Sequence, residues 1–256
     1  MSVTVSTPIS PLLSLRLALR ELRGGLRGFY IFIACIALGV TAIAGVGSLA
    51  GSLADGLARE GRVILGGDLQ FSLIHREIGA GERAFMESRG RVSQTGTLRA
   101  MARAESGDAS LVEIKAVDGA YPLYGEVKLD PSISLADALT EKDDTFGAAA
   151  DPVLLSRLNI TPGAKLTVGD ATFEVRAALT TEPDKLAAGI VFGPRLLISN
   201  AALRATGLIQ PGSLVRWHYD VRLADTNASD AATKQIATQA REQFPQSGWT
   251  VRTRSN

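Results

Sequence analysis

Four arginines at helical spacing near the start of the 256-residue sequence are the residues whose pattern most clearly suggests a binding chemistry. They are Arg16, Arg20, Arg23 and Arg27. Leucines at every third or fourth position follow another face, so residues 1–27 are predicted to form a basic amphipathic segment. Such a helix can lie in a membrane surface with its guanidinium groups on lipid phosphates. We expect the four arginines to bind lipid headgroups; a basic helix solvated beside the membrane is the alternative.

Side chains that could support catalysis or hold a metal ion are few. The only histidines, His75 and His218, lack the HExxH spacing of a zinc site, and the single Cys35 cannot form a thiolate cluster. The Gly66-Gly67 pair fits no phosphate-binding loop, and the sequence has no GxSxG motif. His218 lies in RWHYD, an alternating pattern typical of a strand. We therefore predict a sheet histidine at this position and a chain that is not an enzyme and binds no cofactor or metal.

An uncharged segment, 28–54, follows the basic stretch. It is longer than the roughly 20 residues that a helix needs to cross the hydrocarbon core, and too long for the core of a cleaved signal peptide. A transmembrane helix is predicted here, with a buried helix of a soluble protein as the alternative. Small residues recur four positions apart within it, and Gly47 and Gly51 are expected to pack against another helix.

The charges beside the span predict how the chain is oriented. Arginines precede it, and basic residues close to a span stay on the cytoplasmic side, so residues 1–27 are expected in the cytoplasm and residues 60–256 outside it. Lys and Arg number 27 against 26 Asp and Glu. This near-neutral balance gives no indication of a nucleic-acid partner.

Residues 60–256 alternate between strand and helix patterns, which is typical of an α+β domain. The order is βαββ, a long insertion, and then βαβ. The last helix is expected to begin at an Asn or Ser cap. Strands are expected at 67–74, 91–103, 109–119, 213–225 and 248–254, and helices at 80–90 and 227–244.

The insertion, 120–212, is predicted to be a small β-rich subdomain. A helix is expected at 151–160, followed by short strands within 161–179 that turn at Pro-Gly and Gly-Asp pairs. Just before the insertion and at its start, Asp118 and Tyr121 are expected to belong to a turn. The stretch Gly147–Ala150 is expected to be at most a short mobile loop.

Seven segments taken together resemble the start of permease subunits of the MacB/FtsX-like ABC transporter superfamily, in particular its YbbP-like branch. In that family the first transmembrane helix is followed by a periplasmic domain, in which a ferredoxin-like porter subdomain is interrupted by a β-rich one. This plan implies a MacB-like core domain over 60–256, with porter-like halves at 60–119 and 213–256. The segments are LALRELRGG, FIACIALGVTAIAGVGSLAGSL, LGGDLQFSL, VEIKAVDGAYPLYG, DPVLLSRLNITPGAKLTVGD, FGPRLLIS and TGLIQPGSLVRWHY.

The resemblance also implies a function. It implies the membrane component of an exporter or extraction system for hydrophobic or lipid-like molecules in the bacterial inner membrane. Such permeases form dimers or pack with other permease helices, bind a separate cytoplasmic ABC ATPase, and convert ATP-driven helix movement into motion of the periplasmic domain. The branch is also associated with a periplasmic esterase of the lysophospholipase type.

One difference from the family leaves other functions open. Those permeases continue through at least three more spans, whereas this sequence ends at residue 256. A truncated product, a fragment or a split subunit is therefore expected. A membrane-anchored periplasmic binding or scaffold module is the main alternative, and a membrane-anchored hydrolase is a third.

Overall fold

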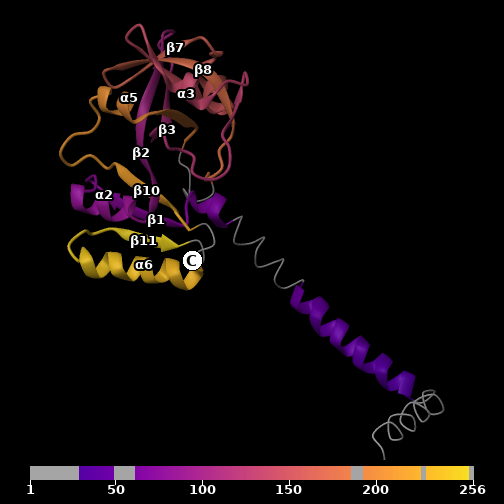
Figure 1. Cartoon of the computed structure of the whole chain (residues 1–256). Coiled ribbons are helices and arrows are strands. Elements are labelled where there is room, and N and C mark those ends of the chain that lie inside the picture. Colours follow the sequence, from indigo (N-terminus) through magenta and orange to yellow (C-terminus); the bar gives the residue numbers. More distant parts are fainter. Residues whose placement is uncertain (1–28, 49–60, 186–192, 226–228, 254–256) are drawn as a thin grey trace, which may run out of the picture. The chain divides into compact units, whose positions relative to one another are not determined.

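The computed structural model describes residues 29–48, 61–185, 193–225 and 229–253 (Figure 1). The chain divides into two units, Met1–Leu57 and Ala58–Asn256, and each is described here by itself. In the first unit the helix Phe29–Ser48 has 20 residues and contains an 18-residue window with a mean hydropathy of 2.4, so it is long and apolar enough to cross a membrane. This supports the predicted transmembrane helix; residues 49–54 of the prediction lie outside the described residues.

The second unit, Ala58–Asn256, is called the C-terminal domain below. After a helical turn at residues 61–65, its described residues form one 11-stranded sheet with short helices. The elements are β1 (Leu69–Ile74), α2 (Ala80–Glu87), β2 (Gly90–Ala104), β3 (Ala109–Val117), β4 (Lys128–Asp130), α3 (Leu135–Leu139), β5 (Glu141–Lys142), β6 (Thr145–Ala150), α4 (Pro152–Leu158), β7 (Lys165–Val168), β8 (Ala171–Thr181), β9 (Arg195–Ser199), α5 (Asn200–Ala205), β10 (Arg216–Leu223), α6 (Asp230–Gln243) and β11 (Thr250–Thr253).

Four strands at one side of the sheet have the order β11-β1-β10-β2. Each neighbouring pair is antiparallel. Helix α2 connects β1 to β2 across β10, and α6 connects β10 to β11 across β1, which gives the two split βαβ units of a ferredoxin-like fold. The predicted α+β class and the order of these elements are confirmed.

The alternation of apolar and polar side chains over Leu69–Leu73 explains which face of these strands the helices cover. Leu69, Phe71 and Leu73 are buried, and they belong to the same core as Phe85 and Met86 of α2. Helix α6 adds two buried alanines to this core and begins at a serine cap, as expected. The residues between the buried ones therefore form the opposite face of the sheet.

Strand β2 is 15 residues long and joins the two parts of the domain. It pairs with β10 over residues 90–97, with β3 over 95–103 and with β7 over 102–104. Figure 1 shows β2 running from the layer of α2, β1 and β10 to the part that contains β7 and β8. The strands of the insertion thus continue the same sheet beyond β3, in the order β9-β6-β8-β4. The subdomain boundaries at 120 and 212 stay a prediction.

Two local features of the insertion agree with the sequence patterns. Helix α4 is capped at its N-terminus by Asp151, whose carboxylate accepts a hydrogen bond from the backbone N–H of Val153, and at its C-terminus by Asn159 in a left-handed conformation. Strands β7 and β8 form an antiparallel hairpin that turns at Gly169-Asp170. The expected helix and the expected pair of strands are confirmed.

The expectation of a mobile loop at Gly147–Ala150 is wrong. These residues belong to β6, which lies between β8 and β9, and the three alanines are fully buried. A run of such small residues resembles a loop because it lacks the β-branched side chains of a strand. Here small size is required, since a Cβ on Gly147 would collide with the carbonyl oxygen of Ala138 in α3.

We expect Gly147→Ala to lower the free energy of unfolding by about 1–3 kcal/mol, because the added methyl group overpacks a rigid backbone contact. Urea unfolding followed by tryptophan fluorescence measures the loss. Gly119→Ala is the control, since a Cβ there meets no atom within 4 Å. Equal stabilities of the two variants would contradict the tight packing of β6 on α3.

Candidate functional site

The face of the sheet opposite the core of α2 and α6 carries polar side chains in register. His218 of β10 lies between Ser72 of β1 and Thr95 of β2. Two positions further along β10, Asp220 lies between Gln70 and Ser93 in the same way. Residues directly opposite each other in adjacent strands share a face, so the polar residues gather here. Such a face can carry a binding site.

A buried charge cluster continues this face across β3. The Nζ of Lys115 donates to Glu182 Oε1 and to both oxygens of Asp184, each at 2.7 Å, and to the Tyr121 hydroxyl at 3.0 Å. Tyr121 in turn donates to Asp184 Oδ1 at 2.6 Å. Lys115 is only 4% exposed. The cluster therefore ties β3 to the segment that follows β8 through fully desolvated ion pairs.

Arg195 of β9 extends the cluster. Its Nε donates to Glu182 Oε2 at 3.1 Å and its Nη1 to Glu113 Oε1 at 2.6 Å. The side chain is 1% exposed, and its buried Nη2 has no hydrogen-bond partner within the described ranges. One donor of a buried guanidinium group is thus left unsatisfied, which is unusual in a folded protein. We call Glu113, Lys115, Tyr121, Glu182, Asp184 and Arg195 the Lys115 cluster.

Burial and charge act in opposite directions on this cluster. Burial raises the pKa of Asp184, but the charge and hydrogen bond of Lys115 outweigh it and hold the pKa below its ordinary value. Burial lowers the pKa of Arg195, but the carboxylates of Glu182 and Glu113 outweigh it and raise the pKa. Burial, followed by the charges of Asp184 and Glu182, raises the pKa of Tyr121 well above its ordinary value. The carboxylate of Asp184 and the guanidinium of Arg195 are therefore charged at neutral pH, and Tyr121 keeps its proton.

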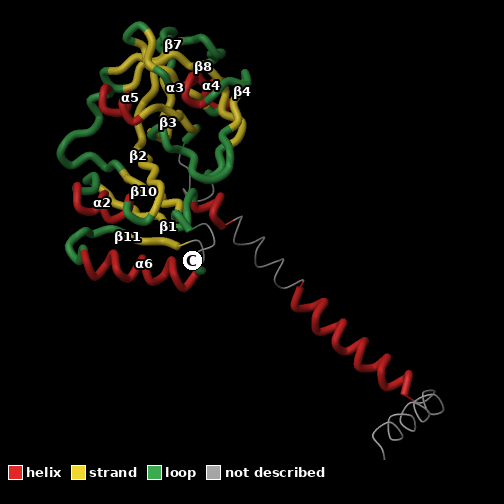
Figure 2. Tube along the Cα trace, in the orientation of Figure 1, coloured by secondary structure: helices red, strands yellow, loops and turns green. Residues whose placement is uncertain are grey.

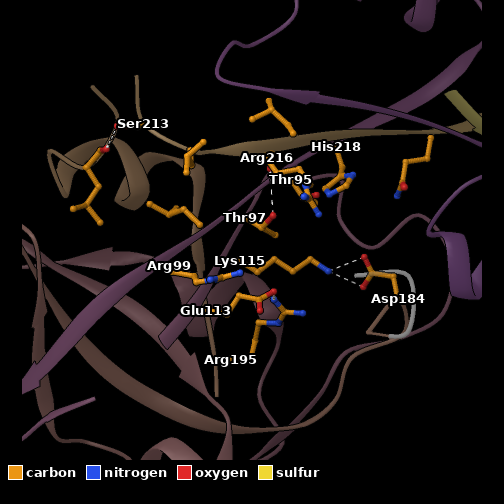
Figure 3. A pocket seen from close by; sticks show the side chains of 15 residues that line it. Thr95, Thr97, Arg99, Glu113, Lys115, Asp184, Arg195, Ser213, Arg216 and His218 are labelled. Atoms are coloured by element: carbon orange, nitrogen blue, oxygen red, sulfur yellow. Dashed lines mark hydrogen bonds and ion pairs between the residues drawn. The ribbon is translucent and has the colours of Figure 1, made fainter. Parts of the chain in front are cut away.

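A cavity of about 550 Å³ lies against the cluster (Figure 3). Lys115, Asp184 and Arg195 line it together with residues of the polar face, among them His218. Apolar side chains also line it, and two of them, Ile74 and Leu214, are 49% and 75% exposed. Its volume is within the range of sites that hold small molecules. The cavity, the polar face and the Lys115 cluster form the candidate site.

The Ser72–His218 pair has the geometry of a nucleophile beside a base, with 2.8 Å between Oγ and Nδ1. A working pair also needs a third group to orient the base, and within the described residues no carboxylate hydrogen-bonds to the His218 ring. Burial is the largest of the effects that lower the pKa of His218 to about 4, so the imidazole is neutral at pH 7. His218 is a sheet histidine, as the strand pattern predicted, and its Nδ1 is hydrogen-bonded to Ser72.

The sequence of this chain is similar to that of an ABC transporter permease. Over 186 aligned residues the chain is 30% identical to the uncharacterized ABC transporter permease YbbP of Escherichia coli strain K12. The aligned region is 72% of this chain and 22% of that protein. The match confirms the resemblance to MacB/FtsX-like permeases. The chain thus spans about a fifth of the length of the relative it matches. No protein-family model matches the chain.

Solved structures of low sequence identity are also similar to this chain. The periplasmic region of MacB from Actinobacillus actinomycetemcomitans covers 75% of this chain, with 91% of its own length matched, at 11% identity and a TM-score of 0.47. The extracellular domain of the ABC-type transporter YknZ from Gram-positive bacteria covers 72% of this chain, with all of its own length matched, at 9% identity and a TM-score of 0.47.

The LGGDLQF segment attaches the start of the C-terminal domain to the sheet. Asp68 is buried, and its Oδ1 lies 3.1 Å from the Nε of Arg62 in the helical turn. Its Oδ2 accepts hydrogen bonds from the Tyr124 hydroxyl at 2.8 Å and from the backbone N–H of Leu223 at 3.0 Å. One carboxylate therefore joins the turn, β10 and the start of the insertion.

Buried hydrogen bonds of Gln70 also connect the helical turn to β10. The Nε2 of Gln70 donates to the carbonyl oxygen of Leu65 at 3.1 Å and to Asp220 Oδ1 at 2.9 Å. Burial raises the pKa of Asp220 to about 7. Gly66, between the two contacts, has a positive φ of 81° that favours glycine, and a Cβ there would approach the Asp220 carboxylate. The Gly66-Gly67 pair is therefore a turn into a strand, as expected.

Only some of the site residues predicted from sequence are among the residues that the structure describes. Gly47 lies in the described helix, where no atom lies within 4 Å of an added Cβ. Its packing against another helix stays a prediction. Gly51 and the four arginines proposed to bind lipid headgroups, Arg16, Arg20, Arg23 and Arg27, lie outside the described residues.

Sequence reasoning missed the Lys115 cluster. Asp118 was expected in a turn, and its Oδ1 does accept hydrogen bonds from the N–H groups of Ala120 and Tyr121. The turn also carries the Tyr121 hydroxyl into the cluster, which a turn assignment alone could not predict. A signal was present in VEIKAV, where Glu113 and Lys115 alternate with apolar residues in a strand whose other residues are mostly buried.

Proposed function

We propose that this chain provides the first transmembrane helix and the outer domain of an ABC-type permease that works with a separate cytoplasmic ATPase. The observation that carries the proposal is the 30% identity to the permease YbbP over 186 residues. In this proposal the chain lies in the bacterial inner membrane with residues 1–27 in the cytoplasm and residues 60–256 in the periplasm. The basic stretch before the span supports this orientation.

The contacts of the segment 61–70 support mechanical coupling. Asp68 and Gln70 fix the helical turn to β10 through buried hydrogen bonds, so a displacement of the turn would move the sheet with it. Lys115 then links the sheet to the segment after β8. A displacement of the helical turn at residues 61–65 would thus reach both parts of the C-terminal domain.

The nature of the cargo and the other partners belong to the same proposal. We propose hydrophobic or lipid-like cargo, association with other permease helices or a second copy, and a periplasmic esterase as a further partner. Packing of Gly47 and Gly51 against a neighbouring helix is the contact through which assembly would occur. The chain supplies no catalytic step in this scheme.

Affinity purification of the tagged full chain from membranes of its native host tests the proposal. An ABC ATPase is expected to co-purify. Chemical cross-links are expected between this ATPase and residues of the chain on the cytoplasmic side of the span. The variant Gly47→Leu/Gly51→Leu should still insert but should recover several-fold less ATPase, because bulky side chains prevent close helix approach. Leu38→Ile, a conservative change within the span, serves as the matched control.

A different outcome would favour the second candidate function. If the inserted chain recovers no ATPase under any condition, the permease proposal is wrong. A membrane-anchored binding module would then be the better account, and the cavity beside the Lys115 cluster is the observation that favours it.

A further inference from the structure

The charges around the cavity favour a negatively charged occupant. Four cationic side chains line it against two carboxylates, and Glu182, which lies behind the lining, compensates one more cation. The lining cations are Arg99, Lys115, Arg195 and Arg216, and the lining carboxylates are Glu113 and Asp184. The balance on the cavity wall is therefore positive.

Arg216 contributes most directly to this balance. It is exposed, and its neighbours in register on the adjacent strands are Ile74 and Thr97, neither of which carries a charge. Arg195 adds the buried Nη2 that has no partner among the described residues. Arg216 and Arg195 thus line the same cavity, and Arg216, an exposed cation with uncharged neighbours in register, suits a carboxylate or phosphate oxygen.

The charges that surround His218 show the same balance. Besides burial, the charges of Lys115, Arg216 and Arg252 lower its pKa, and the charge of Asp184 raises it. The ring is neutral at pH 7, and when the Ser72 hydroxyl donates to its Nδ1, its Nε2–H is a hydrogen-bond donor. His218 therefore lies in a region where cations outnumber anions and can itself donate to an anion.

The same cavity has an apolar side. Ile74 and Leu214 line it and remain largely exposed, although large apolar side chains in solvent gain by being covered. Leu98 and Leu208 line it as well and pack against the main core. A purely ionic ligand would leave this surface uncovered. An occupant with both an anionic group and a short apolar chain would match both sides.

We propose that this cavity binds a small amphiphile with a single anionic group, a phosphate or a carboxylate. The anionic group lies against Arg216 and His218, and the apolar chain covers Ile74 and Leu214. This binding is a property of the C-terminal domain. It holds whether or not the chain works with an ATPase, so its test can fail independently of the proposed function.

Calorimetric titration of the full chain in phosphatidylcholine nanodiscs tests this site, with empty nanodiscs as the blank. Hexyl phosphate and hexanoate are the anionic probes; hexylamine, hexanol and inorganic phosphate are the comparisons. At least one anionic probe is expected to bind roughly tenfold more tightly than hexylamine or hexanol, since charge-assisted hydrogen bonds stabilise only the anions. Whichever anionic probe binds more tightly identifies the head group.

Two variants place the ligand in the cavity. Arg216→Gln should weaken binding of the anionic probe about tenfold, and Leu214→Ser should weaken it severalfold without changing its preference for an anion. Two matched controls lie at exposed positions outside the cavity lining and should leave binding unchanged. Arg241→Gln on α6 removes a guanidinium group, as Arg216→Gln does, and Val153→Ser on α4 removes an apolar side chain, as Leu214→Ser does. Three results would overturn the proposal: equal affinity for hexylamine, equal affinity for inorganic phosphate, or variants that bind like their controls.

Discussion

Lys115→Met is expected to lower the free energy of unfolding of the C-terminal domain by about 3–5 kcal/mol, because it leaves the buried carboxylate of Asp184 without its cation and that of Glu182 with Arg195 alone. Methionine keeps much of the volume of the lysine chain, so the loss reports charge and hydrogen bonding. Glu182 and Asp184 would each lose a 2.7 Å ion pair, and both are almost fully buried.

Urea unfolding in detergent micelles measures this loss. The only two tryptophans of the sequence, Trp217 and Trp249, are both in the C-terminal domain, so their fluorescence reports this domain alone. Lys234→Met on the exposed face of α6 is the matched control and should change stability by less than about 0.5 kcal/mol. A Lys115→Met variant as stable as this control would show that the cluster does not hold β3 to the segment after β8.

Asp220→Asn is expected to stabilise the domain at alkaline pH and to leave it nearly unchanged in acid. The folded-state pKa of Asp220 is about 7, above the ordinary value of 3.8. The folded state therefore keeps a proton that the unfolded chain releases. The contribution of protonated Asp220 to the free energy of unfolding is fully present below about pH 4 and is lost as the pH rises to about 7.

The asparagine variant cannot ionise, and it keeps an oxygen that can accept the hydrogen bond from Gln70. Its stability relative to the natural chain should therefore rise by on the order of 3–4 kcal/mol between pH 4 and pH 8. Comparing the two proteins at each pH removes the effects of other titrating groups. Asp143→Asn, in an exposed turn, is the control. A difference that does not depend on pH would show that Asp220 is ionised throughout this range.

Local patterns predicted the elements of the ferredoxin-like half well. The alternation in LQFSLI indicated a strand with one buried face, and the structure buries Leu69, Phe71 and Leu73. Ser229, within the expected Asn or Ser cap, accepts a hydrogen bond from the N–H of Ala232. Signals of this kind depend on neighbouring residues, so a single sequence contains them.

The site depends on contacts between distant residues, and so patterns could not predict it. Lys115 and Asp184 are 69 positions apart, and no local rule indicates that they meet. Local patterns also could not predict that residue 147 must be a glycine. A side chain there is excluded by the backbone of Ala138, which is not a neighbour of Gly147 in the sequence. Spacing within the sequence indicates chemistry only where the ligand groups are close along the chain.

The position of β10 in the sheet has a consequence for how the chain is made. Strand β1 pairs only with β10 and β11 among the described strands, and Gln70 and Asp220 are 150 positions apart. Strands β2 and β3 can form their hairpin soon after synthesis, but β1 must wait until almost the whole domain has been produced. Pairings between such distant segments are slow, and the unpaired edges are prone to aggregation meanwhile. Until β10 has been synthesised, at residue 223, β1 has no partner strand. A chaperone that covers β1 during this time would therefore reduce aggregation of the nascent chain most.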